Sequence, residues 1–166
     1  MAEGHAHQGR CDGHGHATLP DVNAILARAR AFATARKIPF TEMRARVLTA
    51  LAGETKPLTA YEIVDRLSSP KKVQPVQVYR ALDFLQEAGC VHRLASKASY
   101  FACDHSHHGG EAVVFLVCND CGAVEEASSP AIAASLEEVA KASGFQSANP
   151  IVELEGRCAT CTSHAA

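Results

Sequence analysis

Two Cys-x-x-Cys pairs, Cys118/Cys121 and Cys158/Cys161, place the strongest constraint on how this chain can fold. Two residues between paired cysteines allow both thiolates to reach one metal ion from a tight turn. Two such pairs complete a tetrahedral set of four thiolates, which suits zinc. Because 36 residues separate the pairs, the ion would join the beginning and the end of a C-terminal unit. The spacing therefore predicts a structural zinc site.

Disulfides and a redox-active Cys-x-x-Cys are the alternative uses of such pairs. A lone redox pair would not need a second copy, and disulfides are disfavoured in a reducing compartment. The sequence contains no recognisable export signal and no apolar run near the roughly 18 residues of a membrane span. We therefore expect a cytoplasmic protein without a membrane partner, in which Cys90 is a small buried residue.

The charged residues are divided unevenly along the chain, although the formal net charge is only −2. Residues 22–100 carry 13 Lys and Arg against 6 Asp and Glu, a net charge of +7. Residues 101–166 carry 2 against 9, a net charge of −7. A basic N-terminal segment favours a polyanionic partner such as nucleic acid. A solvated basic surface is the alternative that charge by itself leaves open.

Residues 1–20 are rich in Gly, His and Ala and have little apolar surface to bury. This composition predicts a disordered tail. Its scattered ligands predict at most a weak accessory metal site, formed by His5, His7, Cys11, His14 and His16.

The pattern of residues 21–98 predicts a run of helices followed by a hairpin. Apolar residues recur at helical spacing after Asp21, and Thr41 can cap a second helix. Thr59–Glu62 is a capping box for a third helix. Pro75 suits the first position of a fourth helix, which ends at Ala88 before Gly89.

Two short strand-like runs come next, Cys90–Leu94 and Ser99–Ala102, joined by a polar turn. Helices followed by a hairpin are typical of a winged helix-turn-helix, whose recognition helix would start at Pro75. Its exposed side chains near the N-terminal end are predicted to reach base edges: Gln77, Tyr79 and Arg80. A half-buried core position is the alternative for Tyr79. Non-specific phosphate contacts are predicted for Lys71, Lys72, Arg93 and Lys97.

The C-terminal pattern predicts a small α/β unit. Ala112–Val117 is a continuous apolar run that suits a buried strand, and residues 123–126 suit a second strand. A helix ends at Gly144, and Ile151–Leu154 suits a third strand. Exposed strand edges in such a unit often pair across a dimer, so we expect a homodimer.

A second concentration of metal ligands lies between the basic segment and the first cysteine pair. One thiolate with imidazoles and carboxylates suits zinc better than iron. Ligands from two rigid bodies would meet in one arrangement, so metal binding would favour that arrangement. The alternative is a polar loop with scattered histidines. The set comprises His92, Cys103, Asp104, His105, His107, His108, Glu125 and Glu126.

On these motifs the chain resembles the zinc uptake regulator branch of the ferric uptake regulator family. The resemblance covers roughly residues 22–161. It rests on Thr59-Ala-Tyr61, Val78–Leu85, Gly89-Cys90-Val91-His92 and the two cysteine pairs, of which the first is followed by Gly122. The family consists of homodimeric bacterial repressors with an N-terminal winged helix and a C-terminal dimerisation domain. The resemblance thus implies a structural zinc site at the four cysteines and adds Tyr61 to the DNA-contacting residues.

The resemblance also implies which residues form the regulatory zinc site. His92, Cys103 and Glu126 match family ligands, together with one histidine of the 105–108 cluster. His108 is the nearest in the chain to the position that relatives use. Glu111 falls close to that position, so the alternates are His105, His107 and Glu111. Relatives also differ at Val76-Gln77, which affects the base contacts and hence the operator sequence.

The sequence therefore predicts an α+β protein that acts as a zinc-responsive repressor of zinc uptake and homeostasis genes, binding double-stranded operator DNA as a zinc-loaded homodimer. Predicted segments are a tail at 1–20, a winged-helix domain at 21–98, a hinge at 99–104, a dimerisation domain at 105–161 and a tail at 162–166. Iron, manganese or peroxide sensing, or zinc storage and delivery, are the alternatives. An enzyme with a small organic substrate is not expected, because no His-x-Glu or His-Glu-x-x-His element is present.

Overall fold

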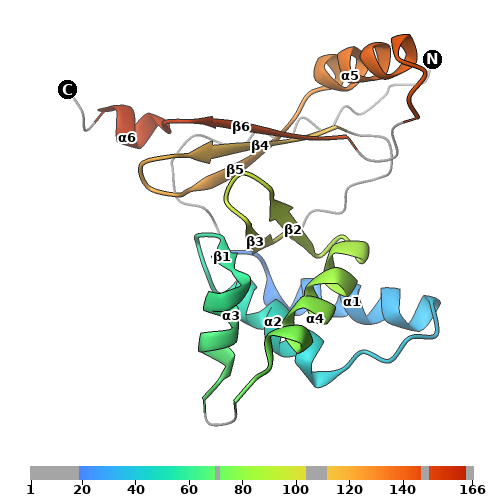
Figure 1. Ribbon diagram of the computed structural model, residues 1–166, viewed down its shortest axis with the longest axis vertical. Coiled ribbons are helices and arrows are strands. Elements are labelled where there is room, and N and C mark those ends of the chain that lie inside the picture. Colours follow the sequence, from blue (N-terminus) through green and yellow to red (C-terminus); the bar gives the residue numbers. More distant parts are fainter. Residues whose placement is uncertain (1–18, 70–71, 104–111, 147–149, 164–166) are drawn as a thin grey trace, which may run out of the picture.

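The computed structural model describes residues 19–69, 72–103, 112–146 and 150–163. These residues form six helices and six strands in an α+β arrangement. Helices of the N-terminal half gather at one end, a sheet lies at the other, and a hairpin stands between them (Figure 1). In these four stretches, no helix combines the length and the apolar character needed to cross a bilayer.

The N-terminal half contains the helices α1 (Val22–Ala35), α2 (Glu42–Ala52), α3 (Ala60–Leu67) and α4 (Pro75–Glu87). Asp21 caps α1 by accepting a hydrogen bond from the Asn23 amide at 2.9 Å. Thr59 and Glu62 form the capping box of α3, in which each side chain accepts from the other residue's backbone amide. Pro75 occupies the first turn of α4. The predicted helix starts are therefore confirmed.

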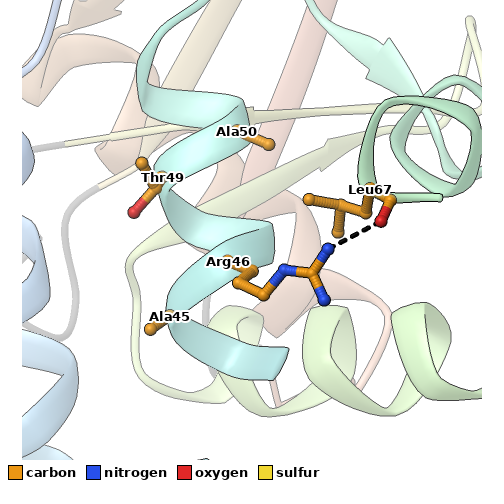
Figure 2. A pocket seen from close by; sticks show the side chains of 5 residues that line it. All are labelled: Ala45, Arg46, Thr49, Ala50 and Leu67. Atoms are coloured by element: carbon orange, nitrogen blue, oxygen red, sulfur yellow. Dashed lines mark hydrogen bonds between the residues drawn. The ribbon is translucent and has the colours of Figure 1, made fainter. Parts of the chain in front are cut away.

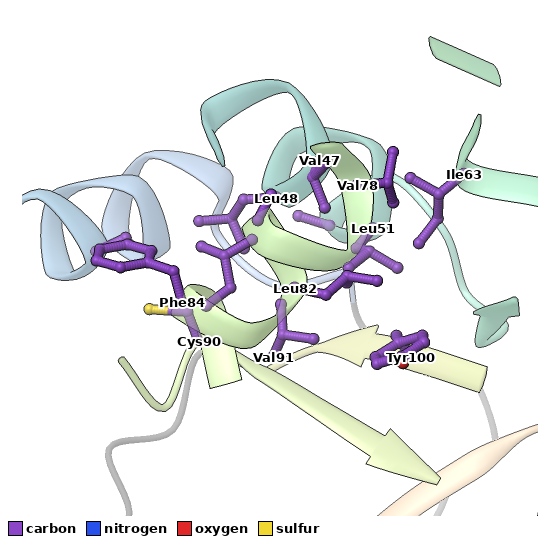
Figure 3. Packing of buried hydrophobic residues seen from close by; sticks show 14 of the residues in the cluster. Val47, Leu48, Leu51, Ile63, Val78, Leu82, Phe84, Cys90, Val91 and Tyr100 are labelled. Atoms are coloured by element: carbon purple, nitrogen blue, oxygen red, sulfur yellow. The ribbon is translucent and has the colours of Figure 1, made fainter. Parts of the chain in front are cut away.

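Apolar residues of the four helices pack into one core, together with the first residues after α4 (Figure 3). Phe84 meets Phe32 edge to face, with ring centroids 5.6 Å apart. Cys90 is fully buried, as predicted for a small apolar residue. Burial of each large aliphatic side chain contributes roughly 1.5–3 kcal/mol relative to its exposure. The largest fully buried members from the helices are Ile25, Leu48, Leu51, Ile63, Leu82 and Leu85.

A hairpin of β2 (Val91–Leu94) and β3 (Ser99–Ala102) follows α4. The short strand β1 (Leu58–Thr59) pairs with the other side of β3, so the sheet order is β1-β3-β2. Both pairings are antiparallel. Helices followed by this hairpin give the winged-helix order that the sequence predicts.

The second sheet has β4 (Val113–Cys118) at its centre. Strand β5 (Val124–Ser128) runs antiparallel to β4, and β6 (Ile151–Gly156) runs parallel to it. Helix α5 (Pro130–Ala142) carries the chain from β5 to β6, as parallel pairing requires a crossover. The short α6 (Ala159–Ser163), which the sequence pattern does not predict, contains the last cysteine.

The β2–β3 hairpin packs on both of its faces, because neighbouring residues of a strand point to opposite sides. Val91 and Tyr100 belong to the helical core. Leu94 and Phe101 instead pack against β4 and β5. The rings of Phe101 and Phe115 meet edge to face, with centroids 5.0 Å apart. The hairpin therefore connects the helical core to the second sheet, and the predicted domain limits, whose hinge overlaps β3, remain a prediction.

A shallow hollow of about 350 Å³ lies between α2 and the end of α3 (Figure 2). The Arg46 guanidinium crosses it and donates to the Leu67 carbonyl at 2.6 Å, satisfying one of the last carbonyls of α3. None of the predicted metal ligands lines it. Its lining residues are Ala45, Arg46, Thr49, Ala50 and Leu67.

Candidate metal centre and nucleic-acid interface

The four cysteines of the two pairs come together where β4 and β6 end. These strands run in parallel, and Cys118 pairs with Gly156 in their register. Cys121 lies in the turn after β4, Cys158 follows β6, and Cys161 lies in α6. All four Sγ atoms lie within 4.8 Å of one another. Parallel strand pairing thus gathers two distant turns, called the first and second knuckle below, into one cluster.

The spacing of the sulfur atoms fits a tetrahedral zinc ion. The Sγ atoms of Cys121 and Cys158 are 3.8 Å apart. Zn–S bonds of about 2.3 Å in tetrahedral geometry place two ligand sulfurs about 3.8 Å apart. A disulfide requires an S–S distance of about 2.05 Å, and none of the described cysteines forms a disulfide. Four thiolates with no open position match a structural zinc site rather than a catalytic one.

Backbone amides surround this cluster. The Cys158 amide donates to Cys118 Sγ at 3.3 Å, and the Cys161 amide donates to Cys158 Sγ at 3.5 Å. Hydrogen bonds from the Cys121 and Cys158 amides lower the pKa of Cys118 to about 6. Hydrogen bonds with the neighbouring thiols, that of Cys158 first, raise the pKa of Cys161 to about 12. The two shifts are opposite because backbone amides stabilise the Cys118 thiolate, whereas hydrogen bonds with other thiols favour the protonated form of Cys161. A divalent cation would favour the thiolate form of all four.

Contacts besides the sulfurs also hold the two knuckles together. Arg157 donates to an Asp120 carboxylate oxygen at 2.6 Å, which raises the pKa of the guanidinium. The Asn119 amide donates to the Gly156 carbonyl at 2.8 Å. Gly122 has a φ of 74°, a left-handed conformation that favours glycine, as expected for a tight turn after the first knuckle. These contacts therefore hold the two knuckles next to each other.

The structure describes part of the second predicted metal set. Cys103 is buried after β3, and its Sγ lies 3.3 Å from Glu126 Oε2 on β5. His92 lies on β2, with its ring centroid 5.1 Å from that of Phe115, the cross-strand partner of Glu126. Across the four described stretches, only the four-cysteine cluster groups three or more ligands closely enough for an ion. The regulatory site stays a prediction, since several of its candidates lie outside the described residues: Asp104, His105, His107, His108 and Glu111.

Arg28 of α1 holds the backbone on which Cys103 sits. Its guanidinium donates to the Gly89 carbonyl at 3.0 Å and also to the Cys103 carbonyl. The Cys103 amide donates to the Cys90 carbonyl at 3.1 Å. These contacts fix the position from which the Cys103 thiol approaches β5. The sequence pattern of α1 gives no sign of this role of Arg28, because it marks only the apolar face of the helix.

Exposed side chains of α3 and α4 form the face predicted to meet DNA. Tyr61 on α3 is 68% exposed, and Tyr79 on α4 is 41% exposed, so Tyr79 is not a core residue. Gln77 and Arg80 are exposed near the start of α4. Gln77 Oε1 also accepts from the N-cap amide of α4 at 3.2 Å, so this side chain helps to start the helix. The predicted phosphate contact Lys71 lies outside the described residues.

The other predicted phosphate contacts lie before α4 and on the hairpin. Lys72 and Arg93 are exposed. Lys97, in the hairpin turn, extends toward the second sheet: its Nζ donates to Asn119 Oδ1 at 2.8 Å and lies 3.6 Å from Glu155 Oε2. DNA contacts for these residues stay predictions, and Lys97 has protein partners in this arrangement.

The sequence model of the ferric uptake regulator family matches residues 36–155. The zinc uptake regulation protein of Escherichia coli (strain K12) is 31% identical to the chain over 138 residues. That alignment covers 82% of this chain and 81% of the relative.

Two solved structures have a similar fold. One is a zinc uptake regulator complexed with zinc and DNA, with a TM-score of 0.75 and 31% identity, covering 87% of this chain and 97% of the other. The other is the holo form of XcZur, with a TM-score of 0.73 and 36% identity, covering 86% of this chain and 99% of the other.

Proposed function

This chain belongs to the ferric uptake regulator family, and on that premise we propose that it is a zinc-responsive repressor of zinc uptake and homeostasis genes. It would bind double-stranded operator DNA in the cytoplasm as a zinc-loaded homodimer. Family membership makes the chain a transcription regulator rather than an enzyme.

The observation that carries the proposal is the meeting of Cys103 and Glu126 at the junction of hairpin and second sheet. The Sγ atom of Cys103, at the end of β3, lies 3.3 Å from the Oε2 atom of Glu126 on β5. A metal bound there would hold the two halves in one arrangement, and a thiolate ligand favours zinc over iron or manganese. His92 and His108 are the further ligands that we assign to this regulatory ion.

A second zinc ion belongs at Cys118, Cys121, Cys158 and Cys161, where it has a structural role. The sulfur spacing and the amide hydrogen bonds support this assignment. Such an ion contributes directly to the folding free energy, since the site does not exist in the unfolded chain. This site is therefore expected to stay filled at zinc concentrations that leave the regulatory site empty.

DNA recognition is assigned to α4 and to Tyr61 of α3. Arg80 can reach a guanine edge with two hydrogen bonds, and Tyr79 can contact a thymine methyl or a phosphate. In a dimer, the two copies of α4 must lie about 34–36 Å apart to enter successive major grooves. Regulatory zinc would raise operator affinity by fixing that separation, and linkage requires operator DNA to tighten zinc binding by the same factor.

A homodimer is supported by apolar residues that the second sheet and α5 leave in solvent. Val139 is 66% exposed, Ile151 52% and Leu154 60%, and α5 has no buried residue. A long exposed edge strand such as β6 is a ready surface for pairing with a second copy. Leu154→Glu should convert the dimer to monomer in sedimentation equilibrium, whereas an unchanged mass would exclude this face as the dimer interface.

The test of the proposed function is operator binding at controlled metal concentrations. A duplex would first be selected from a random-sequence pool in the presence of zinc. Fluorescence anisotropy would then follow its binding to chelator-treated protein titrated in parallel with zinc, iron(II) and manganese(II). We expect zinc alone to raise the affinity, with one zinc ion per chain present beforehand and a second one gained.

Cys103→Ser, with Cys90→Ser as the matched control, separates the alternatives. Cys103→Ser should abolish the zinc response, while the buried Cys90 thiol lies in the helical core and should be dispensable for it. Activation by iron or manganese, or by peroxide, that survives Cys103→Ser would indicate another sensor of this family. Absence of DNA binding under every metal would favour zinc storage or delivery.

A further inference from the structure

The turn of the β2–β3 hairpin is bound by a carboxylate of the second sheet. Glu153 on β6 accepts three hydrogen bonds from two consecutive turn residues. Its Oε1 accepts from the Ala95 amide at 2.6 Å. Its Oε2 accepts from the Ser96 amide at 3.0 Å and from the Ser96 hydroxyl at 2.6 Å. Both carboxylate oxygens are thus used by a single turn 57 residues away in the chain.

The chemistry of these contacts favours an ionised Glu153. Burial raises the pKa of this carboxyl, but the Ser96 hydroxyl, the two amides and the charge of Arg93 together hold it below its usual range. Hydrogen bonds to an ionised acceptor are about twice as strong as neutral ones. Two adjacent amides also match the two oxygens geometrically, so one carboxylate fixes both the position and the orientation of the turn.

Lys97 makes a second connection from the same turn. Its Nζ contacts Asn119, which lies in the first knuckle between two zinc-binding candidates, and approaches Glu155 on β6. The turn is therefore connected to both β6 and the four-cysteine cluster. We use the term wing latch for these contacts of Glu153, Asn119 and Glu155 with residues 95–97.

Beneath the wing latch, an apolar contact joins the same two halves. Leu94 is fully buried against the second sheet, and Phe101 meets Phe115 edge to face. The apolar contact favours close approach but is not directional. The wing latch supplies the direction, because its hydrogen bonds form in one orientation of the hairpin relative to β6.

We propose that Glu153, at the centre of the wing latch, positions the winged helix for DNA and zinc without binding either. This inference rests on the proposed function, because it names what holds the metal-binding arrangement together besides the metal. Cys103 and Glu126 lie 3.3 Å apart in this arrangement, in which the hairpin packs on the second sheet. When the hairpin is docked, two of the regulatory ligands already lie next to each other. Zinc binding then does not have to supply the free energy of ordering the two halves, so that cost does not reduce the zinc affinity.

The test compares Glu153→Gln with Glu87→Gln. Both variants lose one negative charge, but among the described residues Glu87 pairs only with Arg36, and that pair is exposed. Since a lost negative charge by itself strengthens DNA binding, the control separates charge from position. Three readouts are needed: hydrogen exchange of the Ala95 and Ser96 amides by NMR, zinc affinity of the second site, and zinc-dependent affinity for the selected duplex. Zinc retained by the four cysteines would report that the fold is intact.

We expect Glu153→Gln to speed exchange of both amides and to weaken second-site zinc binding and operator binding about tenfold or more, since charge-assisted hydrogen bonds are lost. Glu87→Gln should leave zinc binding unchanged. If both variants bind zinc and the duplex equally well, the wing latch is a local surface contact and the proposal is wrong. If the unmodified protein shows no zinc-dependent DNA binding, the proposed function fails, while exchange of the two amides still reports whether the latch forms.

Discussion

Replacement of Leu94 by Ala should loosen the contact between the hairpin and the second sheet while leaving the helical core intact. Leu94 is 0% exposed and packs with Val113, Phe115 and Val117 of β4 rather than with the helices. The substitution removes three carbon groups at about 0.8 kcal/mol each, or about 2.4 kcal/mol before any cavity forms. A residual cavity would bring the loss into the range of about 2–5 kcal/mol.

Leu85→Ala is the matched control, because Leu85 is also 0% exposed but belongs to the helical core. Hydrogen exchange measured residue by residue by NMR would locate each loss. A change of about 2.4 kcal/mol corresponds to about a 50-fold change in an opening equilibrium. We expect Leu94→Ala to speed exchange by about this factor in β3 and β4, with a much smaller effect in α2 and α4.

Leu85→Ala should give the reverse pattern, with the larger effect in α2 and α4. Equal acceleration of helical exchange by both substitutions would contradict this expectation, because it would place Leu94 in the same cooperative unit as the helices. The hairpin would then not be a layer shared between two cores.

Four further predictions concern the metal, the DNA face and a helix cap. Cys118→Ser should lose the tightly held zinc and unfold the second sheet, as seen in zinc counts and circular dichroism, while Cys90→Ser keeps both. Arg80→Ala should weaken binding to the selected duplex by about 1–3 kcal/mol and relax its sequence preference in competition assays. Lys72→Ala should instead weaken binding to all sequences and lower the salt dependence of log K by about one. The amide and hydroxyl of its N-cap partner hold the pKa of Glu62 below its ordinary value. The stability that the ionised cap contributes is therefore complete above the unfolded-state pKa of about 4.3, and it is lost as the pH falls through the lower folded-state pKa. Glu62→Gln should remove that part of the pH dependence of stability, as measured in thermal melts.

Local features of the fold could be predicted from the sequence. The capping box at Thr59–Glu62 and the start of α4 at Pro75 depend on residues a few positions apart, so their signals are contiguous in the chain. The two cysteine pairs were also informative, because metal chemistry fixes their spacing and requires that they meet. Their meeting through the parallel pairing of β4 and β6 needed the structure.

Apart from Cys103 and Glu126, which the predicted ligand set places together, the contacts between the two halves could not be predicted. A strand with apolar residues on both faces has the same sequence pattern whether one core or two cores cover it. The pattern therefore does not show that Leu94 packs on the second sheet. Glu153 lies in a strand with polar and apolar residues, and nothing in its neighbours marks a partner at Ser96. Arg28 gives no signal for the same reason, since its acceptors are backbone carbonyls far along the chain. Directional contacts of this kind depend on tertiary geometry rather than on local pattern.

The parallel pairing that gathers the cysteines also orders events during synthesis. The first knuckle and β4 are made 36 residues before Cys158. At about 5–20 residues per second, the ribosome needs roughly 2–7 seconds to bridge that interval. Over this interval the chain contains the partner strand β5 of β4 but not yet β6, and Cys118 and Cys121 supply only two of the four thiolates of the site. The second knuckle ends that interval by completing the site.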